Sequence, residues 1–289
     1  MTLDLDRPSW LASLPFFAAH AVALATPFLA PFAWRRLALA ACVYAVRMFA
    51  ITAGYHRYFS HRAYRTSRAF QLVLAVVGAS AAQKGPLWWA AHHRDHHRFS
   101  DGPEDVHSPL RRGFWWSHVG WILARRFDGT KHERVKDLAR YPELRLVDRF
   151  HHLAPIALGT GLFLAGGVPA LLWGFFVSTV VLWHATFAIN SLAHLFGTRR
   201  YETGDGSRNN LALALVTFGE GWHNNHHFHP SSARQGFFWW EVDLSHLALR
   251  FLRVLRVVRD LRTPPASVRL AHLRPSRGVP AQRSLSEAG

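Results

Sequence analysis

The chain has 289 residues, of which 49% are hydrophobic and only 18% are charged, and it contains 21 Phe and 12 Trp. Its 34 Lys and Arg against 18 Asp and Glu give a formal net charge of +16, a balance that nucleic-acid-binding proteins also show. The basic residues concentrate in two stretches, residues 94–149 with twelve and residues 199–283 with thirteen, and both stretches flank long apolar segments. Cytoplasmic loops of membrane proteins carry such an excess, so the pattern favours a membrane protein and argues against nucleic acid as a partner.

The single cysteine, Cys42, lies inside an apolar run. This excludes a disulfide framework and a cysteine-based zinc site, so any metal must be bound by nitrogen and oxygen. The first ten residues, MTLDLDRPSW, have no basic n-region and no clear small-residue cleavage site. We therefore expect no removable signal peptide and expect the first apolar segment to direct membrane insertion.

Four apolar segments approach the length of about 20 residues that a helix needs to cross a bilayer. They are residues 11–34, 37–56, 154–173 and 174–194. Arg35 and Arg36 lie in the expected outer loop between the first two segments, so they are an exception to the rule that basic residues stay on the cytoplasmic side. Residues 69–90 begin with an apolar run too short to span, so we expect a re-entrant or interfacial segment. If it crossed, the histidines before and after it would lie on opposite sides of the membrane.

Two later segments are amphipathic and one is polar. Residues 113–148 alternate aromatic and basic side chains, as expected at headgroup depth, and residues 237–262 set apolar side chains against arginines. Residues 263–289 are rich in Pro, Ser and Arg and predict a disordered tail. We expect one all-α integral membrane domain over residues 1–262, with four transmembrane helices, a helical cap on the cytoplasmic side and both termini cytoplasmic.

Ten of the 20 histidines lie in three tight groups and at one isolated position. The groups are HRYFSH at residues 56–61, HHRDHH at 92–97 and HNNHH at 223–227, and NSLAH ends at His194. On a helix, i, i+3 and i+4 spacing puts His93, His96 and His97 on one face, where they can converge on a metal; the third group repeats this spacing. His56 and His61 are about 140° apart on an α-helix. That pair therefore needs a helix end or a distortion, or it serves two different metals.

The His56/His61 pair, the triplets that begin at His93 and His223, and His194 together offer nine imidazoles. Nine are too many for one ion of four to six ligands, and this predicts two metals. By ligand type alone, iron, copper, nickel or zinc fits. A membrane haem protein is a competing hypothesis, but its paired histidines would lie within the membrane on separate helices rather than at the helix ends. A metal transporter would need ionisable residues midway along the spans. Arg47 is the only clear one, and a cation cannot bind a metal.

The motifs resemble those of the membrane fatty-acyl desaturases, especially the acyl-CoA delta-9 type. The resemblance covers about residues 47–244 and rests on ITAGYHRYFSH, HRDHHRFSD, NSLAH and GEGWHNNHHFHPSSAR. It implies an O2-dependent enzyme that introduces a cis double bond into a saturated acyl chain, with delta-9 the expected position. A membrane fatty-acid hydroxylase or alkane monooxygenase with a similar centre is the nearest alternative.

The resemblance also implies a di-iron centre with nine histidine ligands and Asn190 reaching one iron through water. The implied ligands are His56, His61, His93, His96, His97, His194, His223, His226 and His227. Two electrons must come from outside. The sequence has no haem or flavin motif, so a separate ferredoxin or a cytochrome b5-like protein with its reductase is the expected donor.

Several polar residues beside these motifs are candidates for supporting roles. Carboxylates often orient metal-binding imidazoles, and the sequence offers Asp101, Glu104, Asp105 and Glu220 close to the groups. His92 lies outside the implied ligand set, so we expect it beside the ligands or facing the substrate. His107 and His118 match family positions and are interpreted as structural.

For the substrate, Thr52, Met48 and Tyr44 lie one, two and three turns from His56 on one helical face and could line an apolar tunnel. The resemblance supports this for Met48 and Tyr44, and it implies that Met48→Ala would lengthen the accepted chain.

The acyl carrier is left open by the sequence. Arg125 and Arg126, just after Trp121, match a basic pair that contacts CoA phosphates in related enzymes. However, the Arg and Asp that the family usually has directly before the second histidine group are replaced by Ala91 and His92. CoA, acyl carrier protein and a phospholipid therefore all remain possible carriers.

Overall fold

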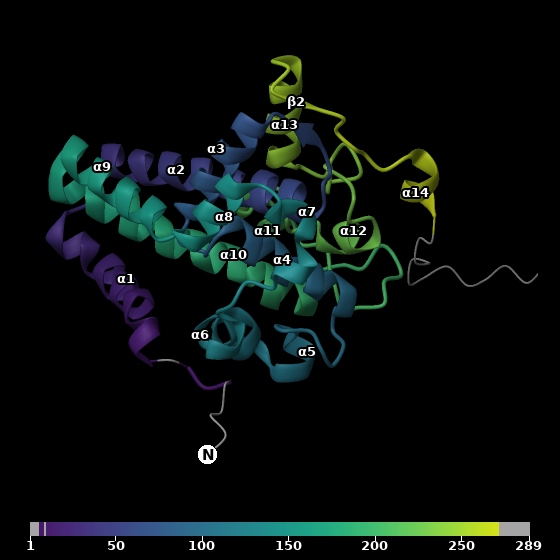
Figure 1. Ribbon diagram of the computed structural model, residues 1–289, viewed down its shortest axis with the longest axis horizontal. Helices are drawn as coiled ribbons and strands as arrows, with labels where there is room; N and C mark the ends of the chain where they lie inside the picture. The colour runs from purple at the N-terminus through teal and green to yellow at the C-terminus, as the bar shows by residue number, and fades with distance from the viewer. Residues whose placement is uncertain (1–5, 9, 272–289) are drawn as a thin grey trace, which may run out of the picture.

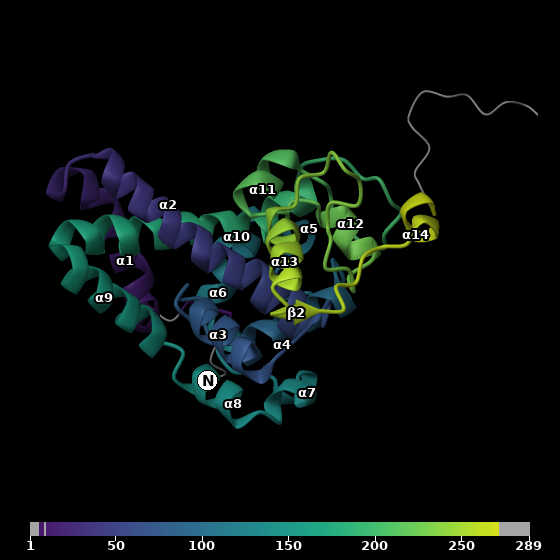
Figure 2. The same ribbon diagram turned by 90° about the horizontal axis from the view of Figure 1, so that it is seen from above.

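The computed structural model describes residues 6–8 and 10–271, and it is almost entirely helical (Figure 1). The one sheet in this part of the chain pairs β1 (Arg65–Thr66) antiparallel with β2 (Val258–Arg259). Three helical stretches are long and apolar enough to cross a membrane, Trp10–Leu29, Trp34–Ser60 and Leu153–Leu195. They extend from one end of the molecule, whereas the short helices gather at the other end (Figure 2).

The first two stretches are α1 (Trp10–Leu29) and α2 (Trp34–Phe49), and α2 continues without a break into the π-helical segment η1 (Ala50–Ser60). Large apolar side chains such as Leu24 and Phe28 on α1 are exposed, as expected of a surface that faces lipid. Every residue of η1 is buried. The chain therefore changes from a lipid-facing helix to a fully enclosed one at Phe49.

The third stretch contains α9 (Leu153–Ala170), the π-helical η5 (Leu171–Val177) and α10 (Ser178–Leu195). Its helical backbone is interrupted at Gly166 and Gly167, and Gly167 has a φ of +63°, which a glycine adopts without strain. Beyond this point the chain folds back, so that α9 packs against η5. The break lies earlier than the expected boundary between residues 173 and 174, because the glycine pair supplies the turn.

The segment expected to be re-entrant or interfacial forms two helices, α3 (Arg68–Ala79) and α4 (Pro86–Phe99). α3 begins where Ser67 Oγ accepts a hydrogen bond from Phe70 N, and it is not long enough to be a spanning helix. α4 begins at a proline, and Asp148 Oδ1 accepts the free N–H groups of Leu87 and Trp88, each at 2.9 Å. That carboxylate belongs to α8 (Pro142–Arg149), which fixes α8 against the start of α4.

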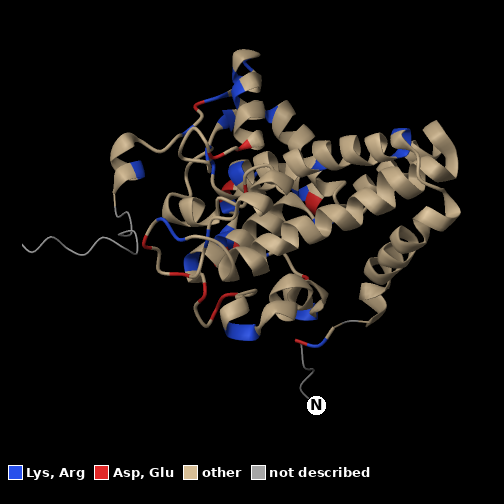
Figure 3. Ribbon diagram, turned by 180° about the vertical axis from the view of Figure 1, so that it is seen from behind, with Lys and Arg blue, Asp and Glu red and all other residues tan. Residues whose placement is uncertain are grey.

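The amphipathic segment 113–148 divides into short helices instead of one long one. Before α8 come α5 (Pro109–Arg112), η2 (Trp116–Gly120), α6 (Trp121–Leu123), η3 (Arg125–Phe127), η4 (His132–Arg134) and α7 (Lys136–Ala139). α11 (Leu211–Val216), α12 (His223–Phe228) and α13 (Leu244–Val254) complete this end of the molecule. Charged residues gather here, while the long apolar helices carry almost none (Figure 3).

The C-terminal segment departs from the expected disordered tail. Ala266–Leu270 form a short helix, α14, and the Tyr201 hydroxyl donates to the backbone oxygen of Arg269 at 2.7 Å. This long-range contact orders a stretch whose composition alone predicts disorder. Residues 272–289 of the expected tail lie outside the described residues.

Close packing of η1 against α3 generates a stability prediction. A Cβ on Gly78 would overlap the ring of Tyr55, which is fully buried immediately before His56. We expect Gly78→Ala to lower the free energy of unfolding by about 1–3 kcal/mol, because the enclosed ring has no space to move. The measurement is the thermal unfolding midpoint of the purified protein in detergent.

The matched control is Gly161→Ala, since a Cβ there meets no atom within 4 Å. Equal midpoints for the two variants would contradict the predicted packing.

Candidate metal centre

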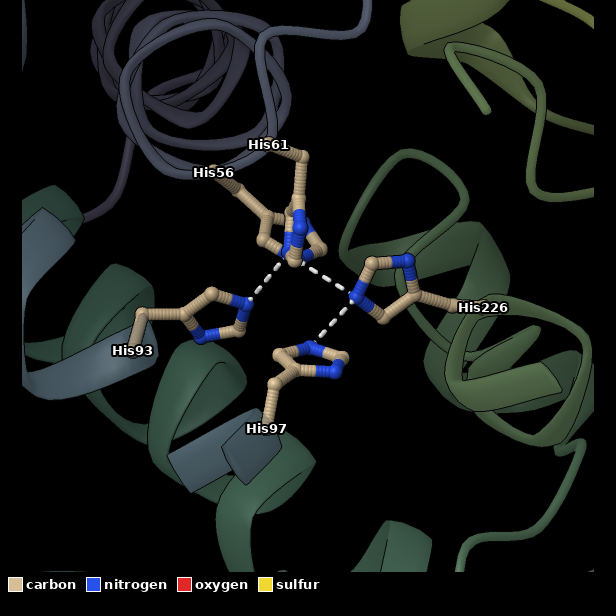
Figure 4. A group of neighbouring side chains, drawn as sticks. All are labelled: His56, His61, His93, His97 and His226. Atoms are coloured by element: carbon tan, nitrogen blue, oxygen red, sulfur yellow. Dashed lines mark hydrogen bonds between the residues drawn. The ribbon is translucent and has the colours of Figure 1, made fainter. Parts of the chain in front are cut away.

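Five imidazoles from three segments form the first group of candidate ligands: His56, His61, His93, His97 and His226 (Figure 4). One ligand nitrogen from each ring lies within 4.8 Å of all the others. His226 Nε2 is 2.9 Å from His56 Nε2 and 2.8 Å from His97 Nε2, and His61 Nε2 is 2.8 Å from His93 Nε2. The rings therefore point their nitrogens into one small volume.

The π-helical backbone of η1 brings the first two of these rings together. His61 N donates to the backbone oxygen of His56 at 3.3 Å, a bond between residues five apart. Because a π-helix has wider turns than an α-helix, residues at this spacing lie nearly above each other, and the two ring centroids are 5.0 Å apart. Of the two possibilities that the sequence left open, the structure shows a distorted helix with both rings in one group.

The second group has four imidazoles, His96, His194, His223 and His227. His194 Nε2 lies 3.0 Å from His223 Nε2. α4 and α12 each give an i, i+4 pair to one group and their third histidine to the other. The expectation that each triplet converges on one metal is corrected. At 100° per residue, His96 is about 100° from His97 around α4, so it faces the second group.

The arrangement fits metal ions better than it fits hydrogen bonds. A neutral imidazole nitrogen donates or accepts once, yet His226 Nε2 has two imidazole nitrogens at hydrogen-bond distance. Two nitrogens bound at right angles to one ion at about 2.1 Å are about 3.0 Å apart, which matches the observed spacings. His227 Nε2 is also buried without a hydrogen-bond partner in the described structure. All nine predicted histidines are thus placed in two groups that could hold metal ions.

Carboxylates hold the outer nitrogens of four of these rings. His96 Nδ1 donates to Asp105 at 3.1 Å, His194 Nδ1 donates to Asp101 at 2.9 Å, and His56 Nδ1 donates to Glu220. Such bonds fix the tautomer and the direction of a ligand ring. The prediction is therefore confirmed for Asp101, Asp105 and Glu220, whereas Glu104 is exposed and has no such contact in the described structure.

The fourth carboxylate, Asp205, was missed by the sequence reasoning. Its Oδ2 accepts from His227 Nδ1 at 2.6 Å, and its Oδ1 accepts from Ser207 N at 3.0 Å. Asp205 lies in a loop between two histidine motifs and at no ligand spacing from either. The only signal in the sequence is the turn-forming GDGS segment that holds it.

Protonation at the centre suits divalent cations. Burial lowers the pKa of His93 and His97 well below the usual histidine value, and neighbouring imidazoles lower both further. Burial raises the pKa of Asp101, but its hydrogen bond and charge interaction with His194 outweigh this and leave that pKa at about 2. His93 and His97 therefore favour the neutral form and Asp101 the charged form, the forms in which these groups bind or support a metal.

Arg57, almost fully buried in η1, ties the first histidine group to the rest of the chain. Its guanidinium donates to Glu220 at 3.1 Å and to Asp243 at 2.9 Å. Glu220 also contacts His56, and Asp243 caps α13 by accepting from His246 N. The buried cation thus compensates two carboxylates, one of which orients a ligand ring.

An apolar cavity of about 990 Å³ reaches the centre, with His93 and Asn190 among its lining residues. Its walls come mainly from α1, α4, α9, η5 and α10. Along α10 and η5 the lining extends from Asn190 to Leu171, on the order of 25 Å at about 1.5 Å per residue. Gln83 Nε2 donates to Thr186 Oγ1 at 2.7 Å within this wall. The cavity has the shape and polarity to hold a long alkyl chain beside the histidines.

Two polar residues on the cavity wall have unused hydrogen-bonding atoms. Trp121 is 6% exposed and His92 is 2% exposed, and both line the cavity. The indole N–H of Trp121 has no partner in the described structure, nor has Nε2 of His92, whose Nδ1 donates to the Trp88 backbone oxygen at 2.9 Å. His107 also lines the cavity, whereas His118 bonds to Ser191 and His184.

The expected tunnel residues on α2 and η1 do not line this cavity. Thr52 Oγ1 is hydrogen-bonded to Ser245 Oγ, the Tyr44 hydroxyl donates to the Val216 backbone oxygen, and Met48 is fully buried in the core. Tyr44 and Thr52 therefore lie on one side of the helix, as expected, but that side does not line this cavity. Helix α2 and η1 turn it toward α11 and α13, and the backbone beyond Phe49 no longer keeps α-helical spacing.

The expected CoA-binding pair does not line the cavity either. Arg125 and Arg126 are exposed, and Arg126 is 3.5 Å from Asp6. Of the residues predicted to contact substrate, Trp121 and His92 line the cavity.

Comparison with known proteins identifies the family of the chain. A family model described as fatty acid desaturase matches residues 32–255. The chain is 38% identical to an sn-1 stearoyl-lipid 9-desaturase of Synechocystis sp., covering 89% of this chain and 81% of that protein. It is 36% identical to an sn-2 palmitoyl-lipid 9-desaturase of Nostoc sp. (89% and 91% covered) and 37% identical to an acyl-CoA 5-desaturase of Anemone leveillei (85% and 77% covered). With this family match and these identities, the chain belongs to the fatty acid desaturases, oxidoreductases of lipid metabolism.

Proposed function

We propose that this desaturase holds two iron ions in its two histidine groups and introduces a cis delta-9 double bond into a saturated acyl chain. The observation that carries the proposal is the convergence of nine imidazoles in two adjacent groups beside an apolar cavity. The names of the cyanobacterial relatives support the delta-9 position. Nitrogen and oxygen ligands without thiolate suit iron.

Bound iron would supply the O2 reduction, with two external electrons, that removes two hydrogens from adjacent methylene groups. The residues of the chain then have positioning roles. The cavity walls would exclude water and align the alkyl chain, and His93 presents the first group at the wall. We assign Asn190, which also lines the cavity one turn before His194, to contact the second iron through water. Trp121 can donate its unused N–H to a carbonyl oxygen of the substrate.

For topology we propose four membrane spans, counting the two arms of Leu153–Leu195 on either side of Gly167 separately, with the centre and both termini cytoplasmic. The charged end of the molecule supports this orientation (Figure 3). Exposed arginines on α13 and β2, among them Arg250, Arg253 and Arg259, offer a docking surface for an acidic ferredoxin or a cytochrome b5-like donor. Arg125 and Arg126 remain candidate contacts for an acyl carrier at the surface.

The decisive experiment is expression in a host that lacks unsaturated fatty acids, followed by lipid mass spectrometry with double-bond localisation. We expect a cis delta-9 alkene. Alanine at His61 in the first group or at His223 in the second should abolish it, because each removes a ligand. Hydroxylated chains in place of alkenes would instead support the monooxygenase alternative.

The Asp205 contact predicts a change in metal affinity. Asp205→Asn should lower iron affinity by about 10- to 100-fold, because the carboxylate that orients His227 is lost. Iron remaining per chain after dialysis against graded chelator measures this, with the exposed Glu104→Gln as the control. Equal iron retention in the two variants would show that Asp205 does not support a ligand.

The cavity predicts which residues limit chain length. Leu171→Phe should shorten the accepted chain, because it narrows the cavity far from Asn190 along η5 and α10. Met48→Ala should leave the product profile unchanged and lower stability by about 2–5 kcal/mol, since Met48 is packed in the core. Acyl-chain profiling measures both effects.

The control for this test is Leu164→Phe, at a residue on α9 that is 78% exposed and does not line the cavity. If Met48→Ala gave longer products and Leu171→Phe gave no change, the acyl chain would bind beside Met48 and not in this cavity.

A further inference from the structure

A second pocket, of about 520 Å³, lies beside the apolar cavity and has a different character. Its lining is mostly charged or polar: Lys84, Trp88, Asp128, Thr130, His132, Arg145, Asp148, Arg149 and His151. Lys84, Trp88, Asp128 and His151 also line the apolar cavity. A ligand with a polar head and an alkyl chain can therefore occupy both spaces at once.

The pocket lining has three cations, Lys84, Arg145 and Arg149, and two carboxylates, Asp128 and Asp148, so it carries one excess positive charge. Asp128 pairs with Lys84 at 2.8 Å. Asp148 accepts hydrogen bonds from the first N–H groups of α4 and from Thr130 Oγ1 at 2.8 Å, so its charge is directed at that helix. Arg145 and Arg149 lie one turn apart on α8, and the acidic side chains of the same helix bond elsewhere, Glu143 to Arg68 and Asp148 to the start of α4 and to Thr130. Both arginines are exposed, and Arg149 also lies over the ring of Phe150, so an anion can reach two guanidinium groups from solvent.

The position of the pocket indicates where the anion comes from. Arg149 ends α8 four residues before α9 begins at Leu153, and α9 starts a membrane-crossing stretch. Pro155, Ile156 and Thr160 of α9 line the adjoining cavity, as do Ala12 and Phe16 of α1. The pocket therefore lies at headgroup depth, and a lipid of the same leaflet can place its chain in the cavity without leaving the bilayer.

We propose that Arg145 and Arg149 bind the phosphate of a glycerophospholipid whose acyl chain is the substrate in the apolar cavity. Guanidinium groups bind phosphate oxygens through paired charge-assisted hydrogen bonds. The proposal rests on the proposed desaturase function and assigns its carrier. It differs from CoA binding at Arg125 and Arg126, which line neither space.

The test measures lipid binding by full-length protein, without turnover. Purified protein is titrated in nanodiscs of neutral lipid with dipalmitoyl phosphatidylglycerol or with dipalmitoylglycerol, and retained lipid is quantified by native mass spectrometry. The unmodified protein should prefer phosphatidylglycerol. The double variant Arg145→Gln/Arg149→Gln should weaken that binding about tenfold or more, with no change for dipalmitoylglycerol.

Two further pairs make the result specific. Arg98→Gln/Arg140→Gln removes the same charge from exposed positions that line neither space and should leave phosphatidylglycerol binding unchanged. Arg145→Lys/Arg149→Lys keeps the charge and should recover part of the binding, even if the Gln pair lowers the unfolding midpoint. Equal weakening by the Arg98/Arg140 pair, no weakening by the Gln pair, or palmitoyl-CoA displacing phosphatidylglycerol in an Arg125- and Arg126-dependent way would overturn the proposal.

The outcomes also separate this site from the proposed function. Phosphate-dependent lipid binding by a protein that forms no alkene would preserve the site and refute desaturation. Desaturation in cells with no phosphate-dependent binding would preserve the enzyme and refute the site.

Discussion

The fold depends on one constraint: nine imidazoles from η1, α4, α10 and α12 direct ring nitrogens toward one another in the interior, in two groups. Lone pairs packed this closely repel one another unless cations lie between them, so the surrounding protein must hold the rings in place. Four carboxylates on the outer nitrogens do so, with Asp105 and Glu220 almost fully buried. The negative charge of these carboxylates around the imidazoles favours the binding of divalent cations.

The type of helix in each segment determines which histidine spacing brings rings together. α4 and α12 use i, i+4 spacing to give one pair of rings to each group, and η1 uses π-helical spacing to align His56 with His61. η1 is fully enclosed by α3, α4 and α13, and Arg57 connects its two neighbouring carboxylates. A strained helix type is thus maintained by burial and by a compensated internal cation.

At this end of the molecule an apolar cavity adjoins a polar pocket. The apolar cavity extends along α9 and α10, where no charge is available, while the basic pocket opens at α8, where the chain leaves the polar cap. Trp88 and Lys84 belong to both, so the border between alkyl and polar chemistry lies at the start of α4. The histidines follow on that helix, which fixes the distance between the polar border and the metal groups.

The sequence by itself determined the helical class, the apolar stretches, the nine histidines and three of the supporting carboxylates. These follow from spacing and segment length, which are properties of neighbouring residues. Only the tertiary structure decided how the rings divide between two groups, that His56 and His61 act together, and that Asp205 supports His227. It also placed the cavity on α9 and α10 and turned Met48, Tyr44 and Thr52 away from it. The physical reason is that a face of a helix acquires its neighbours through long-range packing, and a local change to π-helical turns rotates every later side chain.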